Sequence, residues 1–581
     1  MRSAGAISTF ASFFSFRYLF LHYFLAESHP CQWLKVNCKG TTPLLAVFSE
    51  TSQVRFFRDF MISERRMEDM QRRALLKSAA LLAAMAPTRS AGQLFDNQEF
   101  RPPPSTGDRL DQGPFDIDQD QGWLTILFTT PSEKPQRNPG LGLVGYTWEE
   151  SGPSLAARAG RETLERHVEN ISSLPFVDVL YIRCDWRNVQ SQPGKLNLHP
   201  VWDLTLDAAR RHGLRVAFRV QLSNPEFQPD QIALPEFLRS RIPLVKIGRI
   251  PRRGNTEYIE PRYDHPEFQK AFAELNDLLA AKFDGDPLIE WVDLMQYGFW
   301  GEGHTSNLSN PFNDFSTAEQ TFAAITSRQL QTWKKTPLAV NTQPDISNVG
   351  NRRILAMAAQ AGAWLRSDSI VVEEPIQIDQ LANRAPWLAA ILEDGYFRQY
   401  DASKLAVDES GVNILENYML HTLDLRANYW ALWTEAANLA RYFETFPRGF
   451  DRLRAALGYR IRPSWVWQRK RHGGAELIVA VSNRGVAGVP GVLWLQLESP
   501  DGQLKLHGTL DSGHPHAGGI RLAAFLLPKG YTGRVHLSAA LELRPGVIKS
   551  VGWTCEQPLN ADGSIAIDIK RDDDPGWRKG V

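Results

Sequence analysis

The sequence predicts a (β/α)8 TIM barrel followed by a smaller antiparallel β-sandwich domain. Short apolar runs alternate with helix-like segments over residues 121–455. Over residues 456–570, strand-like runs are separated by Gly, Pro, Asn and Asp, with no long helical pattern. The 581 residues exceed one average domain, and 43% hydrophobic and 22% charged residues are typical of a globular protein. The net charge of zero does not indicate nucleic acid or an anionic membrane as a partner.

Eight apolar runs are expected to form the barrel strands, because parallel strands buried on both faces are almost continuously apolar. Helix-like segments such as residues 199–213 and 316–335 lie between most of them. A doubly wound sheet is the alternative, but no glycine-rich phosphate loop follows the first run. The eight runs are residues 141–148, 177–186, 214–222, 290–295, 337–343, 369–374, 404–410 and 428–433.

The second domain is expected to be an immunoglobulin-type β-sandwich. Its strand-like runs end at turn-forming residues, as antiparallel strands do. The charged tail, residues 571–581, is expected to be loose. The runs that carry this prediction are residues 475–485, 491–502, 519–528 and 533–543.

Residues 67–92 have the pattern of a bacterial export signal. Arg72 and Arg73 stand before an apolar run, Ala79 to Ala86, which is too short to span a bilayer. The stretch "RRALLK" resembles the twin-arginine export motif. An amphipathic helix of the fold is the alternative. The signal predicts a periplasmic or secreted protein with no stable membrane span in the mature chain.

The chain around this signal is not expected to form a domain. Residues 1–66 are a doubtful upstream leader, with the true start at Met67 or Met70; a membrane anchor is the alternative. Residues 93–120, rich in Pro, Gln and Asp, are expected to be a linker. Downstream of residue 92, Cys184 and Cys555 lie too far apart in sequence to indicate a disulfide framework or a zinc cluster. We therefore expect free thiols, no metal and no cofactor.

The stretch "EWVDLMQYGFWGEGHT", residues 290–305, places one carboxylate just after a predicted strand. Catalytic groups of TIM barrels lie at the carboxyl ends of strands. Cleavage of a glycosidic bond requires two carboxyl groups, one that donates a proton and one that is ionised. Glu302 could be the donor, since Trp300 beside it would exclude water and favour the protonated form. A structural role for Glu302, capping a loop or pairing with an arginine, is the alternative.

Polar and aromatic residues at the other strand ends favour a carbohydrate site. Sugar hydroxyls take hydrogen bonds, and the apolar face of a sugar ring stacks on tryptophan. Each residue alone is unremarkable, but together they would surround one mouth of the barrel. The candidate substrate-binding residues are Trp148, Arg183, Asp185, Trp186, Arg219, Tyr297, Trp300, His304, Asn341 and Trp433.

The stretch "DWRNVQSQPGKLNLHPVWDLTLDAARRHGLRVAFRV" resembles the second-to-third strand region of clan A glycoside hydrolases, especially family 42 β-galactosidase-like barrels. The wider layout is similar to uncharacterised secreted bacterial proteins with a glycosidase-like barrel and an appended β-sandwich. It includes "RNPGLGLVGY", "YDHPEFQKAF", "YGFWGEGH", "LRSDS" and "LGYR". The similarity spans roughly residues 123–545, nearly all of the predicted mature chain.

The resemblance implies an exported, retaining glycoside hydrolase that acts on an oligo- or polysaccharide. Glu302 matches the acid/base position after strand four, and Glu409 matches the nucleophile position after strand seven. Glu373 and Glu374 are reserve candidates for the second carboxylate. The sequence departs from the family pattern at Gly301, where clan A usually has Asn before the acid/base. A catalytically inactive carbohydrate-binding or cell-surface protein on the same barrel is therefore the alternative.

Overall fold

The computed structural model describes residues 122–153, 160–249, 254–303, 312–342, 352–368, 370, 373, 375–394, 414–471 and 474–577. All of them belong to one compact unit, residues 103–581. The predicted leader, export signal and linker lie outside the described residues. Among the described residues, none forms a helix that is long and apolar enough to cross a membrane.

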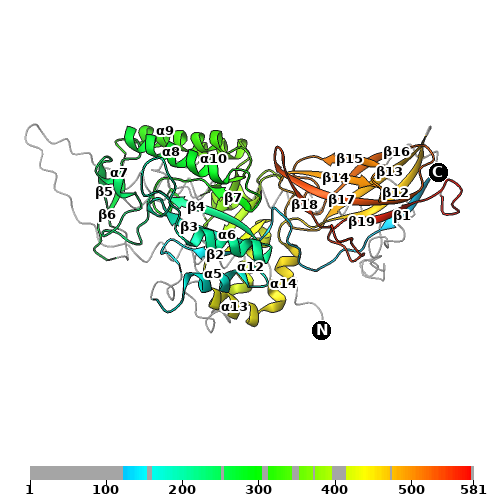
Figure 1. Cartoon of the computed structure of the whole chain (residues 1–581), viewed down its shortest axis with the longest axis horizontal. Coiled ribbons are helices and arrows are strands. Elements are labelled where there is room, and N and C mark those ends of the chain that lie inside the picture. The colour runs from blue at the N-terminus through cyan, green and yellow to red at the C-terminus, as the bar shows by residue number, and fades with distance from the viewer. Residues whose placement is uncertain are drawn as a thin grey trace, which may run out of the picture. The chain divides into compact units, whose positions relative to one another are not determined.

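Eight parallel strands close into a barrel in the order β2–β3–β4–β7–β8–β9–β10–β11. Each neighbouring pair is parallel, and β11 pairs with β2 to complete the ring, so the predicted TIM barrel is confirmed. Figure 1 shows the helices around it. The strands are β2 (Gly142–Trp148), β3 (Val179–Asp185), β4 (Arg215–Gln221), β7 (Ile289–Asp293), β8 (Leu338–Asn341), β9 (Trp364–Ser367), β10 (Ala390–Glu393) and β11 (Tyr429–Leu432).

The helices between these strands begin and end at recognisable signals. Asp314 accepts a hydrogen bond from the amide of Thr317 at the start of α9, and Gly213 ends α6 in the left-handed region at φ +62°. The helices are α5 (Leu164–Ser172), α6 (Val201–His212), α7 (Glu236–Arg239), α8 (Pro266–Phe283), α9 (Phe315–Thr332), α10 (Arg352–Gln360), α11 (Pro375–Ala382), α12 (Ile414–Asp424), α13 (Ala436–Thr445) and α14 (Pro447–Ala456).

Two predicted strands are wrong. The sixth barrel strand is β9 rather than residues 369–374, and the seventh is β10 rather than residues 404–410. Residues 404–410 lie outside the described residues, and the barrel closes with eight strands without them. Arg366 in the middle of β9 hid this strand, because a buried arginine interrupts the apolar pattern. The other six predicted runs each overlap a barrel strand.

An excursion separates the third and fourth barrel strands. It contains α7 and an antiparallel hairpin, β5 (Leu244–Gly248) with β6 (Tyr258–Pro261). The last part of β6 is buried. Its Glu260 accepts a hydrogen bond from the Ser223 hydroxyl, and the Ser223 carbonyl oxygen accepts the amide of Trp300 in the segment that follows β7. This excursion therefore contributes to the carboxyl end of the barrel.

Two antiparallel sheets follow the barrel. One has the order β1–β12–β13–β16, and the other has the order β15–β14–β17–β18 with β19 beside β17. Apolar residues of both sheets belong to one buried cluster. That the sheets form an immunoglobulin-type sandwich stays a prediction. The strands are β12 (Ile461–Arg471), β13 (Gly474–Asn483), β14 (Val492–Glu498), β15 (Lys505–Leu510), β16 (Ile520–Leu527), β17 (Gly533–Arg544), β18 (Val547–Val551) and β19 (Ile565–Ile569).

The predicted boundary at residue 121 assigns β1 (Trp123–Phe128) to the barrel, and this is wrong. Strand β1 pairs with β12 in the four-stranded sheet, with Trp123 opposite Arg469. Sequence position alone suggested the barrel, but β1 finds its partner more than 300 residues away. The second sheet system therefore takes strands from both sides of the barrel sequence.

Glu290 connects the barrel to the sheets through hydrogen bonds and an ion pair. Its side chain is fully buried and accepts hydrogen bonds from the amide of Gly140 at 2.6 Å, Arg215 at 2.5 Å and the Tyr429 hydroxyl at 2.7 Å. Lys549 of β18 adds an ion pair at 3.1 Å. Burial would raise the pKa of Glu290, but Arg215 and Lys549 lower it to about 2.

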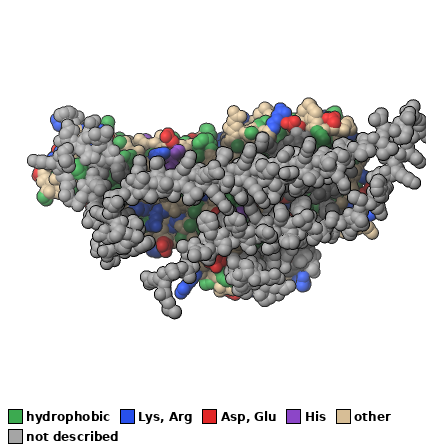
Figure 2. All heavy atoms as spheres, turned by 180° about the vertical axis from the view of Figure 1, so that it is seen from behind, with side chains coloured by type: hydrophobic (Ala, Val, Ile, Leu, Met, Phe, Trp, Pro, Cys, Tyr) green, Lys and Arg blue, Asp and Glu red, His purple; other side chains and the backbone are tan. Residues whose placement is uncertain are grey.

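The face in Figure 2 mixes acidic, basic and hydrophobic side chains wherever described residues are visible.

Candidate active site

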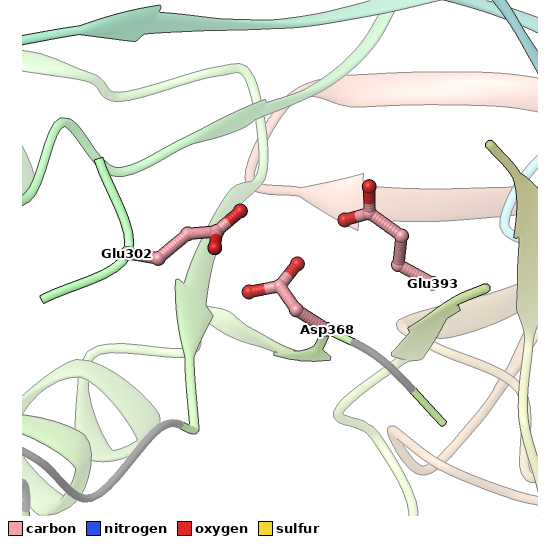
Figure 3. Close-up of side chains that lie close together, drawn as sticks. All are labelled: Glu302, Asp368 and Glu393. Atoms are coloured by element: carbon pink, nitrogen blue, oxygen red, sulfur yellow. The ribbon is translucent and has the colours of Figure 1, made fainter. Parts of the chain in front are cut away.

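Three carboxyl groups meet at the carboxyl end of the barrel. Glu302 follows β7, Asp368 follows β9 and Glu393 ends β10. One oxygen from each lies within 4.8 Å of the others, and Figure 3 shows the three side chains pointing toward one another. All three are at most 5% exposed. Like charges this close in a buried place require either shared protons or positive partners.

Three arginines from neighbouring strands supply positive charge. Arg183 contacts Glu302 at 3.2 Å and Glu393 at 2.6 Å. Arg219 contacts Glu302 at 2.5 Å. Arg366 forms an ion pair with Glu393 and lies 3.2 Å from Asp368. Because β3, β4 and β9 point these arginines inward, they form a buried charge network with the carboxyl groups.

The carboxyl groups differ in protonation. Burial raises the pKa of Asp368 well above its usual range, and the neighbouring carboxyl groups of Glu302 and Glu393 raise it further. Burial acts on Glu393 too, but Arg183 and Arg366 hold its pKa well below the usual value. These opposite shifts favour the protonated form of Asp368 and the ionised form of Glu393.

Another buried carboxyl group, that of Glu150, also contacts Arg183. Glu150 is buried just after β2, 3.4 Å from Arg183, and accepts a hydrogen bond from Trp433 Nε1 at 3.0 Å. Burial raises the pKa of Glu150 to about 7, although Arg183 lowers it. Arg183 thus contacts three carboxyl groups of the site, those of Glu150, Glu302 and Glu393.

The turn that carries Glu302 has an unusual backbone. Trp300 has φ +59°, a left-handed value that is uncommon outside glycine, and Gly301 and Gly303 have φ +72° and +88°. Arg219 donates to the Trp300 carbonyl oxygen at 3.2 Å, and the Trp300 amide donates to Ser223 at 3.0 Å. A side chain at Gly301 would also approach Arg219 to 3.3 Å. The glycines of the sequence motif therefore allow the turn that directs Glu302 inward.

Glu260 is linked to this turn by hydrogen bonds through Ser223 and Tyr263. The Ser223 hydroxyl donates to Glu260 at 2.6 Å, and the Tyr263 hydroxyl donates to its other oxygen. Tyr263 in turn accepts the amide of Gly298 at 3.0 Å. Glu260 is fully buried, and burial raises its pKa to about 7 against the lowering effect of the two hydroxyls. A buried carboxyl group is thus linked by hydrogen bonds to both ends of the segment before Glu302.

Several predicted site residues meet in this network. Arg183 and Arg219 contact Glu302, Asn341 donates a hydrogen bond to Asp368, and Trp433 donates to Glu150. Trp300 is half-buried beside Glu302 and contacts Phe299 at a ring distance of 5.8 Å. These residues, which were predicted because they stand at the ends of several strands, therefore lie at one end of the barrel.

Other predicted site residues are part of the core. Trp148 packs edge-on against His199 at 4.4 Å, and Trp186 is fully buried with its Nε1 donating to Gln190. Tyr297 is fully buried among aromatic rings, Phe312 included. Asp185 accepts a hydrogen bond from Asn224 at 2.8 Å. These contacts are structural, and a role for these residues in sugar binding stays a prediction.

Of the predicted second carboxylates, only Glu373 lies among the described residues. Glu409, Glu374 and His304 lie outside the described residues. Glu373 is described, and its side chain pairs with His421 of α12 at 3.2 Å rather than with Glu302. The carboxyl group that ends the seventh strand is Glu393, since β10 takes this place in the barrel.

Five residues of the network were missed from the sequence: Glu150, Asp293, Arg366, Asp368 and Glu393. Two signals could have found three of them. The motif "LRSDS" contains Arg366 and Asp368, and the apolar run before Glu393 ends in "EDG", a carboxylate and glycine pattern like that around Glu302. Glu150 has no comparable signal, because Glu149 stands beside it after the strand and the sequence does not distinguish the two.

Three clustered carboxyl oxygens also have the spacing of a cation site. However, each of these carboxyl groups already contacts at least one guanidinium group. Fixed positive charge beside the oxygens opposes a divalent cation. The donor set therefore fits a charge-balanced acid–base site better than a metal centre.

Several solved structures are similar to this chain at low sequence identity. No family model and no curated protein matches the chain. The similar solved structures include the catalytic domain of a β-amylase from Paenibacillus polymyxa, 10% identical, covering 51% of this chain and 92% of that chain, with a TM-score of 0.34. An endo-glycoceramidase II from a Rhodococcus species is 13% identical and covers 68% and 99%, with a TM-score of 0.33.

A psychrophilic family 10 endo-β-1,4-xylanase is 9% identical and covers 51% of this chain and 86% of that chain, with a TM-score of 0.30. Identities and TM-scores this low carry no argument about function. The resemblance to family 42 stays unconfirmed.

Proposed function

We propose that the protein is a retaining glycoside hydrolase, exported from the cell, that cleaves O-glycosidic bonds of an oligo- or polysaccharide. The observation that carries this proposal is the approach of Glu302 and Glu393 to within 4.8 Å at the ends of the fourth and seventh barrel strands. Retaining enzymes place their two carboxyl groups about 5–5.5 Å apart, and inverting enzymes about 6.5–9.5 Å apart. Carboxyl oxygens within 4.8 Å of each other leave less room for an intervening water than the inverting range does, which supports retention.

Glu393 is the proposed nucleophile in place of Glu409. Arg183 and Arg366 keep Glu393 ionised, as attack on the anomeric carbon requires. In this step a Glu393 oxygen bonds to the anomeric carbon while the bond to the leaving oxygen breaks and that oxygen takes up a proton. Water then releases the sugar, with its proton returning to the acid/base residue.

The proton donor is Glu302 or Asp368, and the ion pairs of Glu302 decide which of the two it is. Glu302 accepts ion pairs from Arg183 and Arg219, which favour its ionised form. Glu302 therefore acts as acid only if the bound substrate loosens these pairs. The raised pKa of Asp368 favours its protonated form, so Asp368 is the donor if the pairs persist.

Aryl glycosides test these roles. Replacement of the proton donor should spare substrates with good leaving groups, because they need little protonation, and should impair substrates with poor ones. Glu302→Gln and Asp368→Asn are compared on both kinds. Glu393→Gln should abolish turnover of all of them, and a fluorinated glycoside should add a covalent mass to the wild type only. Glu165→Gln, on the exposed first turn of α5, is the control.

A catalytically inactive carbohydrate-binding protein is the second candidate. Its support is the arginine network, which pairs Glu302 and Glu393 with guanidinium groups. Glycan binding by calorimetry without turnover across the aryl glycosides would favour it. Turnover that survives Glu393→Gln would refute the nucleophile assignment.

A further inference from the structure

A buried carboxyl group contacts two of the arginines of the site. Asp293 ends β7 and is 1% exposed. Its Oδ2 lies 3.0 Å from Arg219 Nη2 and 3.4 Å from Arg366 Nε, and the Tyr181 hydroxyl donates to the same oxygen. Trp291 Nε1 donates to the other oxygen at 2.8 Å. Both oxygens of Asp293 are therefore engaged by side chains of the barrel strands.

The same two guanidinium groups reach the proposed catalytic carboxyl groups. Arg219 Nη1 donates to Glu302 at 2.5 Å, and Arg366 Nη2 donates to Glu393. Arg219 thus links Asp293 to Glu302. Arg366 links the same aspartate to Glu393.

The two arginines contact one oxygen although they carry like charges. Both are at most 1% exposed, and a nitrogen of each lies within 3.4 Å of Asp293 Oδ2. Burial acts to lower the pKa of Arg219, and the charge of Arg366 lowers it further. Asp293 is among the groups that raise it. Since buried like charges repel, the anion that both arginines contact decides whether both can stay beside the carboxyl cluster.

We propose that Asp293 is a positioning residue, which holds Arg219 against Glu302 and Arg366 against Glu393. The catalytic consequence depends on the proposed glycosidase function, but the positions of the arginines do not. Without the charge of Asp293, the guanidinium groups lose the oxygen that they share. Glu302 and Glu393 then lose part of the positive charge that favours their ionised forms, so both should bind a proton at higher pH.

Crystal structures test the positions of the arginines and need no activity. Asp293→Asn removes the charge at nearly constant shape. We expect at least one of the two guanidinium groups to move beyond hydrogen-bond distance, about 3.5 Å, from its carboxyl group. A variant structure in which both guanidinium groups keep these contacts would overturn the proposal, whatever the outcome for the glycosidase function.

Asp178→Asn is the matched control. Asp178 is also buried and also contacts two arginines, Arg137 at 3.3 Å and Arg454 at 3.8 Å. It directly precedes β3, at the end of the barrel opposite the carboxyl cluster. Its replacement should lower the stability of the protein without moving the arginines of the site.

The pH dependence of kcat/KM for an aryl glycoside tests the catalytic consequence. In Asp293→Asn both limbs of the profile should move to higher pH by about one unit. The kcat should fall about tenfold or more while KM changes little, because Asp293 is buried and acts through the arginines. A merely structural loss would lower kcat and leave both limbs in place, as is expected for Asp178→Asn.

Two outcomes of this measurement would overturn the proposal. The limbs would stay in place if Asp293 were only structural, or move to lower pH if only its negative charge mattered. A wild type without turnover would refute the glycosidase function instead, and the crystal structures would still decide the role of Asp293.

Tyr181→Phe is the second variant, in case Asp293→Asn does not fold. It removes one hydrogen bond to Asp293 at nearly constant shape and keeps the charge. The expected changes in the arginine contacts and in the pH profile have the same direction and a smaller size. If this variant leaves both unchanged, Asp293 does not position the arginines.

Discussion

Glu260 should make the stability of the protein fall as the pH rises. Its side chain is fully buried beneath the turn of Glu302, and the groups that act on its charge are the hydroxyls of Ser223 and Tyr263. Its pKa rises from the usual 4.5 to about 7 in the folded protein. At about 1.4 kcal/mol for each pKa unit, this difference corresponds to about 3 kcal/mol.

The direction follows from proton linkage. The folded state holds this proton more tightly than the unfolded chain does, so the stabilisation is complete below about pH 4.5 and is lost as the pH rises through about 7. Glu260→Gln imitates the protonated acid and cannot ionise. The free energy of unfolding of the wild type should therefore decline by about 3 kcal/mol relative to the variant between about pH 4 and pH 9.

Urea unfolding at a series of pH values, followed by tryptophan fluorescence, measures this difference. Subtraction of the variant's free energy of unfolding cancels the titration of other buried acids, such as Glu150 and Asp368. Glu165→Gln on the exposed start of α5 is the control and should show no such trend. A constant difference between the wild type and Glu260→Gln across this range would refute the argument.

Three further predictions concern other parts of the chain. Arg183→Met leaves the site carboxylates without their shared guanidinium group and should lower the free energy of unfolding by about 3–5 kcal/mol in urea, since it strands buried charge. Lys549→Met removes a cation from Glu290, so the stability should be lost at a higher pH on acidification, measured by thermal unfolding; an unchanged acid limb would contradict it. Arg72→Lys with Arg73→Lys should leave uncleaved precursor in the cytoplasm, detected by fractionation and immunoblotting.

The sequence pattern was sufficient for the barrel and for one side of its site. Apolar runs that end in polar residues predicted six of the strands, because strands buried on both faces must be apolar whatever their neighbours are. The same rule placed Arg183, Arg219 and Glu302 at one end of the barrel. The glycines around Glu302 also marked a turn, since Gly301 and Gly303 adopt positive φ values.

Only the tertiary structure placed a second carboxyl group from the seventh strand beside Glu302. Residues 404–410 and the run that forms β10 are both short, apolar and followed by acids, and local pattern cannot rank two such runs. The hydrogen-bond register between β9, β10 and β11 selects β10 and places Glu393 against Glu302. The sequence also could not predict the directions of the pKa shifts of Asp368 and Glu393. These depend on burial and on arginines that come from distant strands.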